Sequence, residues 1–343
     1  MKRIAMSLAL AMLAVGAHAA DKELVFKAGH PSLKGFLLPV KMPHPEDNAP
    51  TPARISLGQK LFFDPRLSGD GNMSCATCHN PGLGWSDGMP TARGVKSSVL
   101  GRASPTIINT GYNTIQMWDG RKKSLEDQAM GPMEANVEMN MDITKLFQWM
   151  NTSEDYKVLF EKAYPGEGVN AKTLSKAIAS FERTAISRAS PFDSWVKGNA
   201  KALTTQQVNG FKLFTGKANC IACHNGANFT DNGFHNVGLA SWGIAEPDMG
   251  RYAQKPVNLM KGAFKTPTLR DIARTGPYFH DGSARTLMEV VEHYDKGGVV
   301  TSNLSPGMKP LDLSADDKLA LVAFMQALTS PYTPVQVPEL PLK

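Results

Sequence analysis

The chain has 343 residues, 42% of them hydrophobic, which is enough apolar material for about two globular domains. The formal net charge of +6 is modest for this length, and no run of Lys and Arg is suited to tracking a phosphate backbone, which argues against nucleic-acid binding. No stretch after the first 19 residues approaches the ~18 uninterrupted apolar residues that a membrane-spanning helix needs.

Residues 1–19 have the pattern of a secretory signal peptide. Lys2 and Arg3 precede a mostly apolar run, and Ala17-His18-Ala19 is a small-residue cleavage site. Cleavage there would lower the formal net charge from +6 to +4. The pattern predicts export, and we expect the mature protein to reside in the periplasm.

Residues 20–51 are rich in proline and have no clear periodicity, so they are predicted to form an extended arm over the domains. His30 and His44 lie in this arm, and we interpret them as surface histidines rather than metal ligands.

Two segments share the pattern C-x-x-C-H: Cys75-Ala-Thr-Cys78-His79 and Cys220-Ile-Ala-Cys223-His224. In this pattern the two thiols bond covalently to a haem, and the histidine that follows offers its imidazole to the iron. A zinc site or a disulfide framework is disfavoured, because the histidine follows both times and these four cysteines are all that the chain has. The sequence therefore predicts two covalently bound haem c groups, with His79 and His224 as proximal iron ligands.

A short helix is predicted ahead of each haem segment, over 55–63 and over 207–214. Both contain the pattern G-x-K-L-F, at Gly58 and at Gly210. This internal repeat indicates one helix-then-haem module that is used twice.

Two further helices are predicted from apolar spacing and capping. One carries Leu174, Ala177, Ile178, Phe181 and Ala185, and the other opens at Ser314 with Asp317 three residues later. The second presents Leu321, Val322, Met325 and Leu328 on one face.

The predicted fold is all-α, with two cytochrome-c-like haem domains and the proline-rich N-terminal arm. Pro191 and the Gly198-Asn-Ala stretch mark the junction, so the expected domains are 52–198 and 199–330. A proline-containing tail, 331–343, follows.

Beyond the haem segments, five more motifs occur in a characteristic order: Trp118-Asp-Gly-Arg121, Gln128-Ala-Met-Gly-Pro132, Val137-Glu-Met139, Lys265-Thr-Pro-Thr-Leu-Arg270 and Gly276-Pro-Tyr-Phe-His-Asp-Gly282. With these the chain resembles the bacterial di-haem cytochrome c peroxidases and their MauG-type relatives over essentially the whole length after the predicted signal peptide.

The resemblance implies that the first haem is the peroxidatic one and that Gln128, Pro132 and Glu138 line its distal pocket. Glu138 is then the candidate acid/base, since a carboxylate beside bound peroxide can move a proton from the near oxygen to the far one. Gln128 would be a positioning donor. Trp118 matches the tryptophan that relays oxidising equivalents between the two haems, whereas Trp85 has no such match and is interpreted as packing.

One departure from the best-known peroxidases concerns the first haem. Those enzymes carry a displaceable histidine ligand sixteen residues after the first haem histidine, where this chain has Val95, and no histidine lies between His79 and His224. We therefore expect an open, five-coordinate ferric site that needs no reductive activation.

A second departure concerns the other haem, whose distal ligand in those peroxidases is a methionine. The matching position here is Tyr294, and MauG-type proteins use a tyrosine at that place. A phenolate favours high oxidation states of iron. Met308 and His293 remain rival ligands, and His235 and His280 are interpreted as structural or as supporting the ligands.

The family also holds a calcium ion between the domains. Thr275 and Pro277 match two of its backbone ligands, but Ala103 replaces an asparagine ligand, so occupancy stays open. Partners expected for the haem propionates are Arg102, Arg121, Lys265 and Arg270.

The resulting hypothesis is a periplasmic peroxidase that cleaves hydrogen peroxide at the first haem, while the second haem shares or relays the oxidising equivalents. The reducing partner would be a small redox protein, such as a cytochrome c or a cupredoxin, or a residue of a partner protein that the enzyme oxidises. The alternative is a di-haem electron carrier without peroxide chemistry, which would have two six-coordinate irons.

Overall fold

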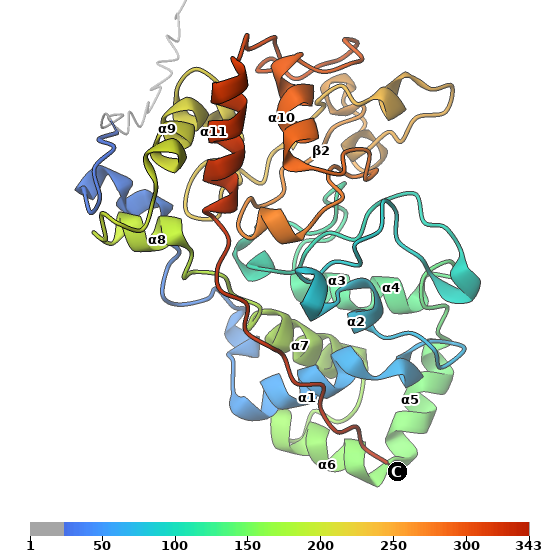
Figure 1. Ribbon diagram of the computed structural model, residues 1–343. Coiled ribbons are helices and arrows are strands. Elements are labelled where there is room, and N and C mark those ends of the chain that lie inside the picture. Colours follow the sequence, from blue (N-terminus) through green and yellow to red (C-terminus); the bar gives the residue numbers. More distant parts are fainter. Residues whose placement is uncertain (1–23, 343) are drawn as a thin grey trace, which may run out of the picture.

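The computed structural model describes residues 24–342, so the predicted signal peptide over 1–19 lies outside the described residues. The described chain forms two mainly helical domains stacked one above the other (Figure 1). Within residues 24–342, no helix has the length and apolar character needed to cross a membrane.

The lower domain in Figure 1 is built from the earlier part of the chain. Its helices are α1 (Pro52–Phe63), α2 (Cys75–Cys78), α3 (Leu125–Ala129), α4 (Gly131–Glu134), α5 (Ile143–Thr152), α6 (Glu154–Ala163) and α7 (Ala171–Glu182).

The upper domain contains α8 (Pro191–Val196), α9 (Thr205–Thr215), α10 (Leu287–Asp295) and α11 (Ala315–Gln326). It also holds a two-stranded antiparallel sheet of β1 (Phe234–His235) and β2 (Phe264–Lys265), in which Phe234 pairs with Lys265 and His235 with Phe264.

Short 3-10 helices complete the connections: η1 (Pro31–Phe36), η2 (Glu46–Asn48), η3 (Pro65–Leu67), η4 (Pro81–Leu83), η5 (Val95–Ser97), η6 (Thr110–Tyr112), η7 (Cys220–Ala222), η8 (Ala240–Gly243), η9 (Arg251–Ala253), η10 (Asn258–Met260) and η11 (Ile272–Arg274).

The internal repeat is also present in the packing of the helices. α1 crosses α7 at Gly58, where a Cβ atom would stand 1.9 Å from the carbonyl oxygen of Ala177. α9 crosses α11 at Gly210 in the same way, with a Cβ atom 1.9 Å from the carbonyl oxygen of Ala320. The glycine of the G-x-K-L-F pattern is therefore what lets the two helices of each module touch backbone to backbone.

The predicted helix starts follow from side-chain capping. Ser314 and Asp317 form the expected capping box at α11, each side chain accepting the other's backbone N–H at 3.1 Å. The apolar pattern that begins at Leu174 forms α7, which ends at Glu182, and Ala185 lies beyond the helix but still within the first core.

The two hydrophobic cores divide the chain earlier than the expected junction between 198 and 199. Phe192 and Trp195 of α8 are buried in the second core, together with Phe211 and Phe324. The aromatic edge-to-face contacts among these rings, such as Phe192–Phe211 at 5.0 Å, hold α8 against α9 and α11.

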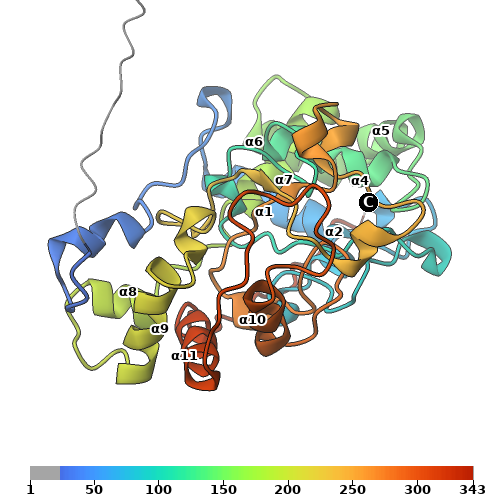
Figure 2. The ribbon, with the colours of Figure 1, turned by 90° about the horizontal axis from the view of Figure 1, so that it is seen from above.

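Each end of the described chain packs against the domain that is more distant from it in the sequence. Leu33 and Phe36 of the N-terminal arm are buried in the second core, and Figure 2 shows the arm beside α8. The arm is thus a packed part of the domain as well as a covering segment. The C-terminal tail runs the other way, down along the first domain (Figure 1), where the Leu342 N–H donates to Asp155 at 3.2 Å.

Candidate functional site

The first haem segment is a single helical turn that presents its histidine in a fixed orientation. Cys75–Cys78 form α2, and the backbone N–H of His79 donates to the Cys75 carbonyl at 2.9 Å. The Nδ1 atom of His79 lies 3.3 Å from the carbonyl oxygen of Trp85. A proton on Nδ1 that donates to this carbonyl leaves Nε2 with the free lone pair that an iron ligand needs.

The second haem segment repeats this arrangement. The His224 N–H donates to the Cys220 carbonyl at 2.9 Å, and His224 Nδ1 lies 3.0 Å from the carbonyl oxygen of Phe229. Burial lowers the pKa of His224 to about 4, so the imidazole is neutral, which is the form that binds metal. The two carbonyl acceptors, Trp85 and Phe229, both adopt positive φ angles, 60° and 50°.

All four cysteines are free and partly buried. Burial raises the pKa of the Cys78 thiol to about 11 and that of the Cys220 thiol to about 12, so neither is a thiolate at neutral pH. A group of possible metal ligands in the described part of the chain, Cys223, Asp231 and His235, uses one of these attachment cysteines. Because a thioether bond to haem removes the thiolate, this group does not support a zinc site.

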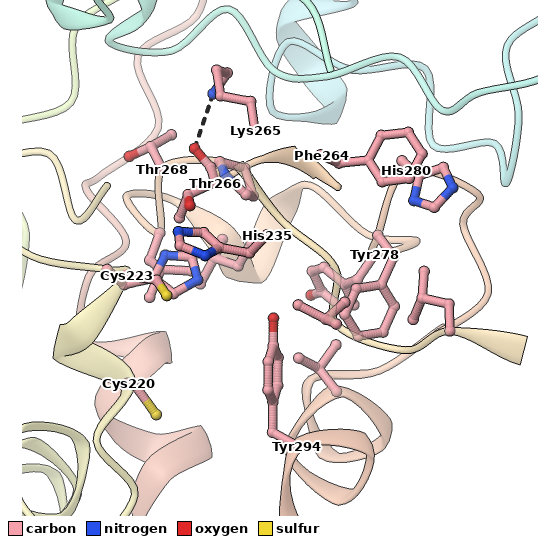
Figure 3. Close-up of a pocket in the computed structure, with 18 of the residues that line it drawn as sticks. Cys220, Cys223, His235, Phe264, Lys265, Thr266, Thr268, Tyr278, His280 and Tyr294 are labelled. Carbon is pink, nitrogen blue, oxygen red and sulfur yellow. Dashed lines mark hydrogen bonds between the residues drawn. The ribbon is translucent and has the colours of Figure 1, made fainter. Parts of the chain in front are cut away.

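A mainly apolar cavity of about 440 Å³ lies against the second haem segment and is named the second cavity after that segment (Figure 3). Cys220, Cys223 and His224 line it together with residues from β2, α10 and the loop that contains Met308. An apolar chamber with two attachment thiols and one neutral imidazole in its wall suits a covalently bound porphyrin, so the residues present fit a haem c.

Tyr294 projects from α10 into this cavity, with its hydroxyl group directed into the open space (Figure 3). Burial raises the pKa of the phenol, and the nearby Cys220 and Cys223 add to the increase. Iron would have to lower that pKa for the phenolate to bind.

The two rival ligands differ in position. His293 is turned away: its Nε2 atom is 2.8 Å from the carbonyl oxygen of Val237, and it is not part of the cavity lining. Met308 does line the cavity. Tyr294 as the distal ligand stays a prediction, with Met308 as the remaining alternative within reach of the same space.

Glu138, expected in the distal pocket of the first haem, lies in the loop after α4 and is half-buried. Burial raises the pKa of its carboxyl, and the positive charge of Arg121 partly opposes the increase. Its charge also contributes to the raised pKa of Cys78, which places the carboxyl near the first haem segment. Gln128 lies in α3 and Pro132 in α4, both half-buried, in the chain that leads to Glu138.

The segment that would carry the displaceable histidine is fixed to the Glu138 loop. The Val95 N–H donates to the Glu138 carbonyl at 2.8 Å, and the Ser98 hydroxyl donates to the Val137 carbonyl at 2.7 Å. A Cβ atom on Gly94 would stand 1.8 Å from that same carbonyl oxygen. This segment therefore acts as a backbone support for Glu138.

Trp118 lies where the two domains meet. Its indole N–H donates to the Ala103 carbonyl at 2.9 Å, and its own carbonyl accepts the Lys265 N–H at 2.7 Å. Trp118 also lines the second cavity, and the His280 ring lies edge-on to its ring with the ring centroids 6.4 Å apart.

His280 and Phe264 form a stacked pair beside Trp118, with ring centroids 3.5 Å apart (Figure 3). Burial lowers the pKa of His280 to about 4, so this ring is neutral and packs as an aromatic group. Phe264 is a residue of this site that none of the sequence motifs contains, although it directly precedes the Lys265 motif.

The groups expected around the calcium ion form hydrogen bonds within the protein. The Ala103 carbonyl is used by Trp118, and Thr275 donates its hydroxyl to the Ile272 carbonyl at 3.2 Å. Thr275 and Pro277 both line the second cavity. A calcium ion between the domains stays a prediction.

The expected propionate partners do not behave alike. Arg270 is fully buried, forms an ion pair with Asp193 at 2.9 Å and donates to the carbonyls of Phe36 and Ala227, so its donors are engaged within the second domain. Lys265 lines the cavity and is buried, which lowers its pKa to about 8.

Arg102 and Arg121 both pair with Asp119. Arg102 also forms an ion pair with Asp248 at 2.6 Å. Arg102 therefore bridges Asp119 of the first domain, which follows Trp118, and Asp248 of the second.

The geometry defines a two-haem protein of the cytochrome c type. Residues 52–201 match the family model described as di-haem cytochrome c peroxidase, and residues 207–329 match that of cytochrome c. The methylamine utilization protein MauG of Methylorubrum extorquens is 43% identical over 89% of this chain and 86% of its own length. The cytochrome c551 peroxidase of Pseudomonas aeruginosa is 37% identical over 83% of this chain and 81% of its own.

Among solved structures, a MauG-like protein associated with microbial copper homeostasis superposes with a TM-score of 0.79 at 30% identity, covering 85% of this chain and 95% of that one. The chain belongs to the di-haem cytochrome c peroxidase and MauG family.

Proposed function

We propose that this chain is a haem-dependent peroxidase that reduces hydrogen peroxide at the first haem and draws the electrons from a protein partner through the second. In the overall reaction, peroxide takes two electrons and two protons and becomes two molecules of water. The bound haem supplies the redox centre that accepts peroxide. The chain supplies the proton transfers, the orientation of the ligands and the path between the two sites.

Glu138 carries this proposal, because it is a half-buried carboxyl near the first haem segment. Its backbone is fixed by the hydrogen bond that the Val95 N–H donates to the Glu138 carbonyl. Its role would be to take the proton from the near oxygen of peroxide and return it to the far oxygen, which leaves as water. Gln128 would donate an amide hydrogen bond to orient the peroxide, and Pro132 would help to exclude water from the pocket. The absence of a histidine between His79 and His224 supports a first site that is open before peroxide arrives.

The test is the reaction of the ferric holoprotein with one equivalent of hydrogen peroxide. Glu138→Gln keeps the size of the side chain but cannot accept a proton, and we expect the rate to fall by about 10²–10⁴-fold. Because burial raises the pKa of Glu138, the wild-type rate should fall as the pH drops through that raised pKa, where the carboxylate becomes protonated.

The acid-side decline should be absent in Glu138→Gln. A variant that reacts at the wild-type rate would remove Glu138 from the mechanism. A ferric protein with no high-spin signal and no response to peroxide would favour the electron carrier instead.

For the subtype, we propose oxidation of a partner protein in the manner implied by the MauG resemblance, supported by Val95 at the histidine position and Tyr294 in the second cavity. Turnover with reduced cytochrome c or cupredoxin, compared with covalent change in a co-encoded protein, distinguishes this from a detoxifying peroxidase. The periplasm is the proposed location, because the signal-peptide pattern at 1–19 and covalent haem both suit an exported protein.

A further inference from the structure

The packing of the two modules shows which residues of α7 and α11 occupy equivalent positions. A Cβ atom on Gly58 would approach the Ala177 carbonyl and then Phe181 at 2.9 Å, and one on Gly210 would approach the Ala320 carbonyl and then Phe324 at 2.8 Å. This register equates Glu182, which follows Phe181, with Met325, which follows Phe324.

Met325 lines the cavity of the second haem site. By the equivalence of the modules, Glu182 occupies the corresponding wall of the first haem site. An independent observation agrees: the charge of Glu182 contributes, after burial, to the raised pKa of Cys75, the first attachment thiol of that site. The two modules therefore differ by a carboxyl group at a position that is an apolar methionine in the other.

The Glu182 carboxyl is buried and incompletely satisfied. The residue is only 4% exposed, and its Oε2 atom has no hydrogen-bond partner among residues 24–342. Burial raises its pKa to about 8, the neighbouring Arg183 lowers it, and Glu126 of α3 raises it. Arg183 is already paired with Glu126, through hydrogen bonds of 2.7 and 3.1 Å, and offsets only part of the effect of burial on Glu182.

We propose that Glu182 exchanges a proton with solvent in step with the electron at the first haem. When the first haem gains an electron from a reductant, such as the redox partner or a chemical mediator, the Glu182 carboxylate binds one proton. When the haem gives up that electron, the carboxyl releases the proton. One negative and one positive charge then move together, which avoids an uncompensated change of charge in the interior.

The sign of the effect follows from the charges. Added negative charge at the haem raises the pKa of a nearby carboxyl, so reduction favours the protonated form. The potential of the first haem should therefore fall as the pH rises through the range where Glu182 titrates, with a slope of up to about 59 mV per pH unit for one proton per electron. Met325 cannot titrate, so the second haem has no carboxyl at this position, and any dependence of its potential on pH would come from other groups, such as Lys265 in its cavity wall.

The experiment is a redox titration of the ferric and ferrous states of the holoprotein, followed optically, between about pH 6 and about pH 10. Wild type is compared with Glu182→Gln, which keeps the shape of the neutral acid, and with Glu182→Met, which copies the second module. We expect both variants to flatten the dependence of the potential on pH for the first haem and to leave that dependence unchanged for the second. Glu138→Gln is the matched control, because it removes the other carboxyl near the first haem.

The proposal would be overturned if Glu182→Gln kept the wild-type slope of potential against pH at the first haem. It would also be overturned if Glu138→Gln lost that slope entirely. If the Glu182 variants fail to fold, redox-difference infrared spectra of the wild type and Glu138→Gln keep it testable. The protonated-carboxyl band should gain intensity on reduction in both proteins, and no change would refute the proposal. The inference rests on haem binding at the first site, and because no peroxide is used, a failure of peroxidase activity is a separate result.

Discussion

At the scale of single residues, each haem histidine is oriented by one backbone carbonyl that faces its Nδ1 atom. His79 and His224 face the carbonyls of Trp85 and Phe229 through Nδ1, and both acceptor residues have left-handed backbone angles. Such an angle is unusual for a bulky residue, and its recurrence in both modules indicates that it is needed to aim the carbonyl. The consequence is that each histidine keeps Nε2 for the iron.

The second haem is where one side chain decides the chemistry. We expect Tyr294→His to change the optical and EPR signals of the second haem and to stop it from sharing oxidising equivalents with the first, because a neutral imidazole stabilises the oxidised iron less than a phenolate does. The measurement is the spectrum before and after one equivalent of peroxide.

Met308→Leu is the matched control for that experiment, because Met308 lines the same cavity. It should leave the second haem unaltered. The reverse outcome, with Tyr294→His silent and Met308→Leu changing the spectrum, would make Met308 the ligand.

At the scale of helices, each haem module depends on one glycine at a helix crossing. Gly58 and Gly210 each leave room for a carbonyl oxygen that a Cβ atom would approach to 1.9 Å. An alanine would favour an isolated helix by about 1 kcal/mol, but here it must push two helices apart.

We therefore expect Gly58→Ala and Gly210→Ala each to destabilise the holoprotein by roughly 3 kcal/mol in denaturant unfolding, since overpacking outweighs helix propensity. Gly35→Ala and Gly101→Ala are controls, because a Cβ atom at these sites meets nothing within 4 Å. They should change stability by no more than about 0.5 kcal/mol. Equal effects at crossing and control sites would show that the crossings tolerate a side chain.

At the scale of the whole molecule, the two domains are joined by the chain ends and by the region around Trp118. The arm contributes Leu33 and Phe36 to the second core, while the tail runs along the first domain. Trp118 binds the Ala103 and Lys265 backbones and lines the second cavity, so it links the domains mechanically and lies beside the proposed path of the electrons.

We expect Trp118→Phe to leave both haem spectra of the resting protein unchanged but to slow electron movement between the haems. Phenylalanine keeps the apolar contact but is much harder to oxidise, and it lacks the N–H that bonds to Ala103. Rapid-mixing spectra after one equivalent of peroxide should show the second haem responding later than in wild type. Synchronous responses of the two haems would argue against a relay at this residue.

The two haem segments, the module repeat, the capped start of α11 and the family could all be predicted from the sequence, because these depend on short spacings whose chemistry is local. It did not place α8 in the second core or the arm inside that core, because burial of Phe192 and Phe36 depends on partners far away in the chain.

The folded structure separates His293 from Tyr294, because these two neighbours on α10 point in different directions, and it brings Met308 from a loop to the same cavity as Tyr294. The packing of the helices also makes Glu182 unusual. Its neighbours in sequence are ordinary for a helix end, but among residues 24–342 its Oε2 atom has no hydrogen-bond partner, and Arg183 is held by Glu126 of another helix. Whether a buried charge is compensated depends on which secondary-structure elements pack against it, and this depends on the tertiary fold.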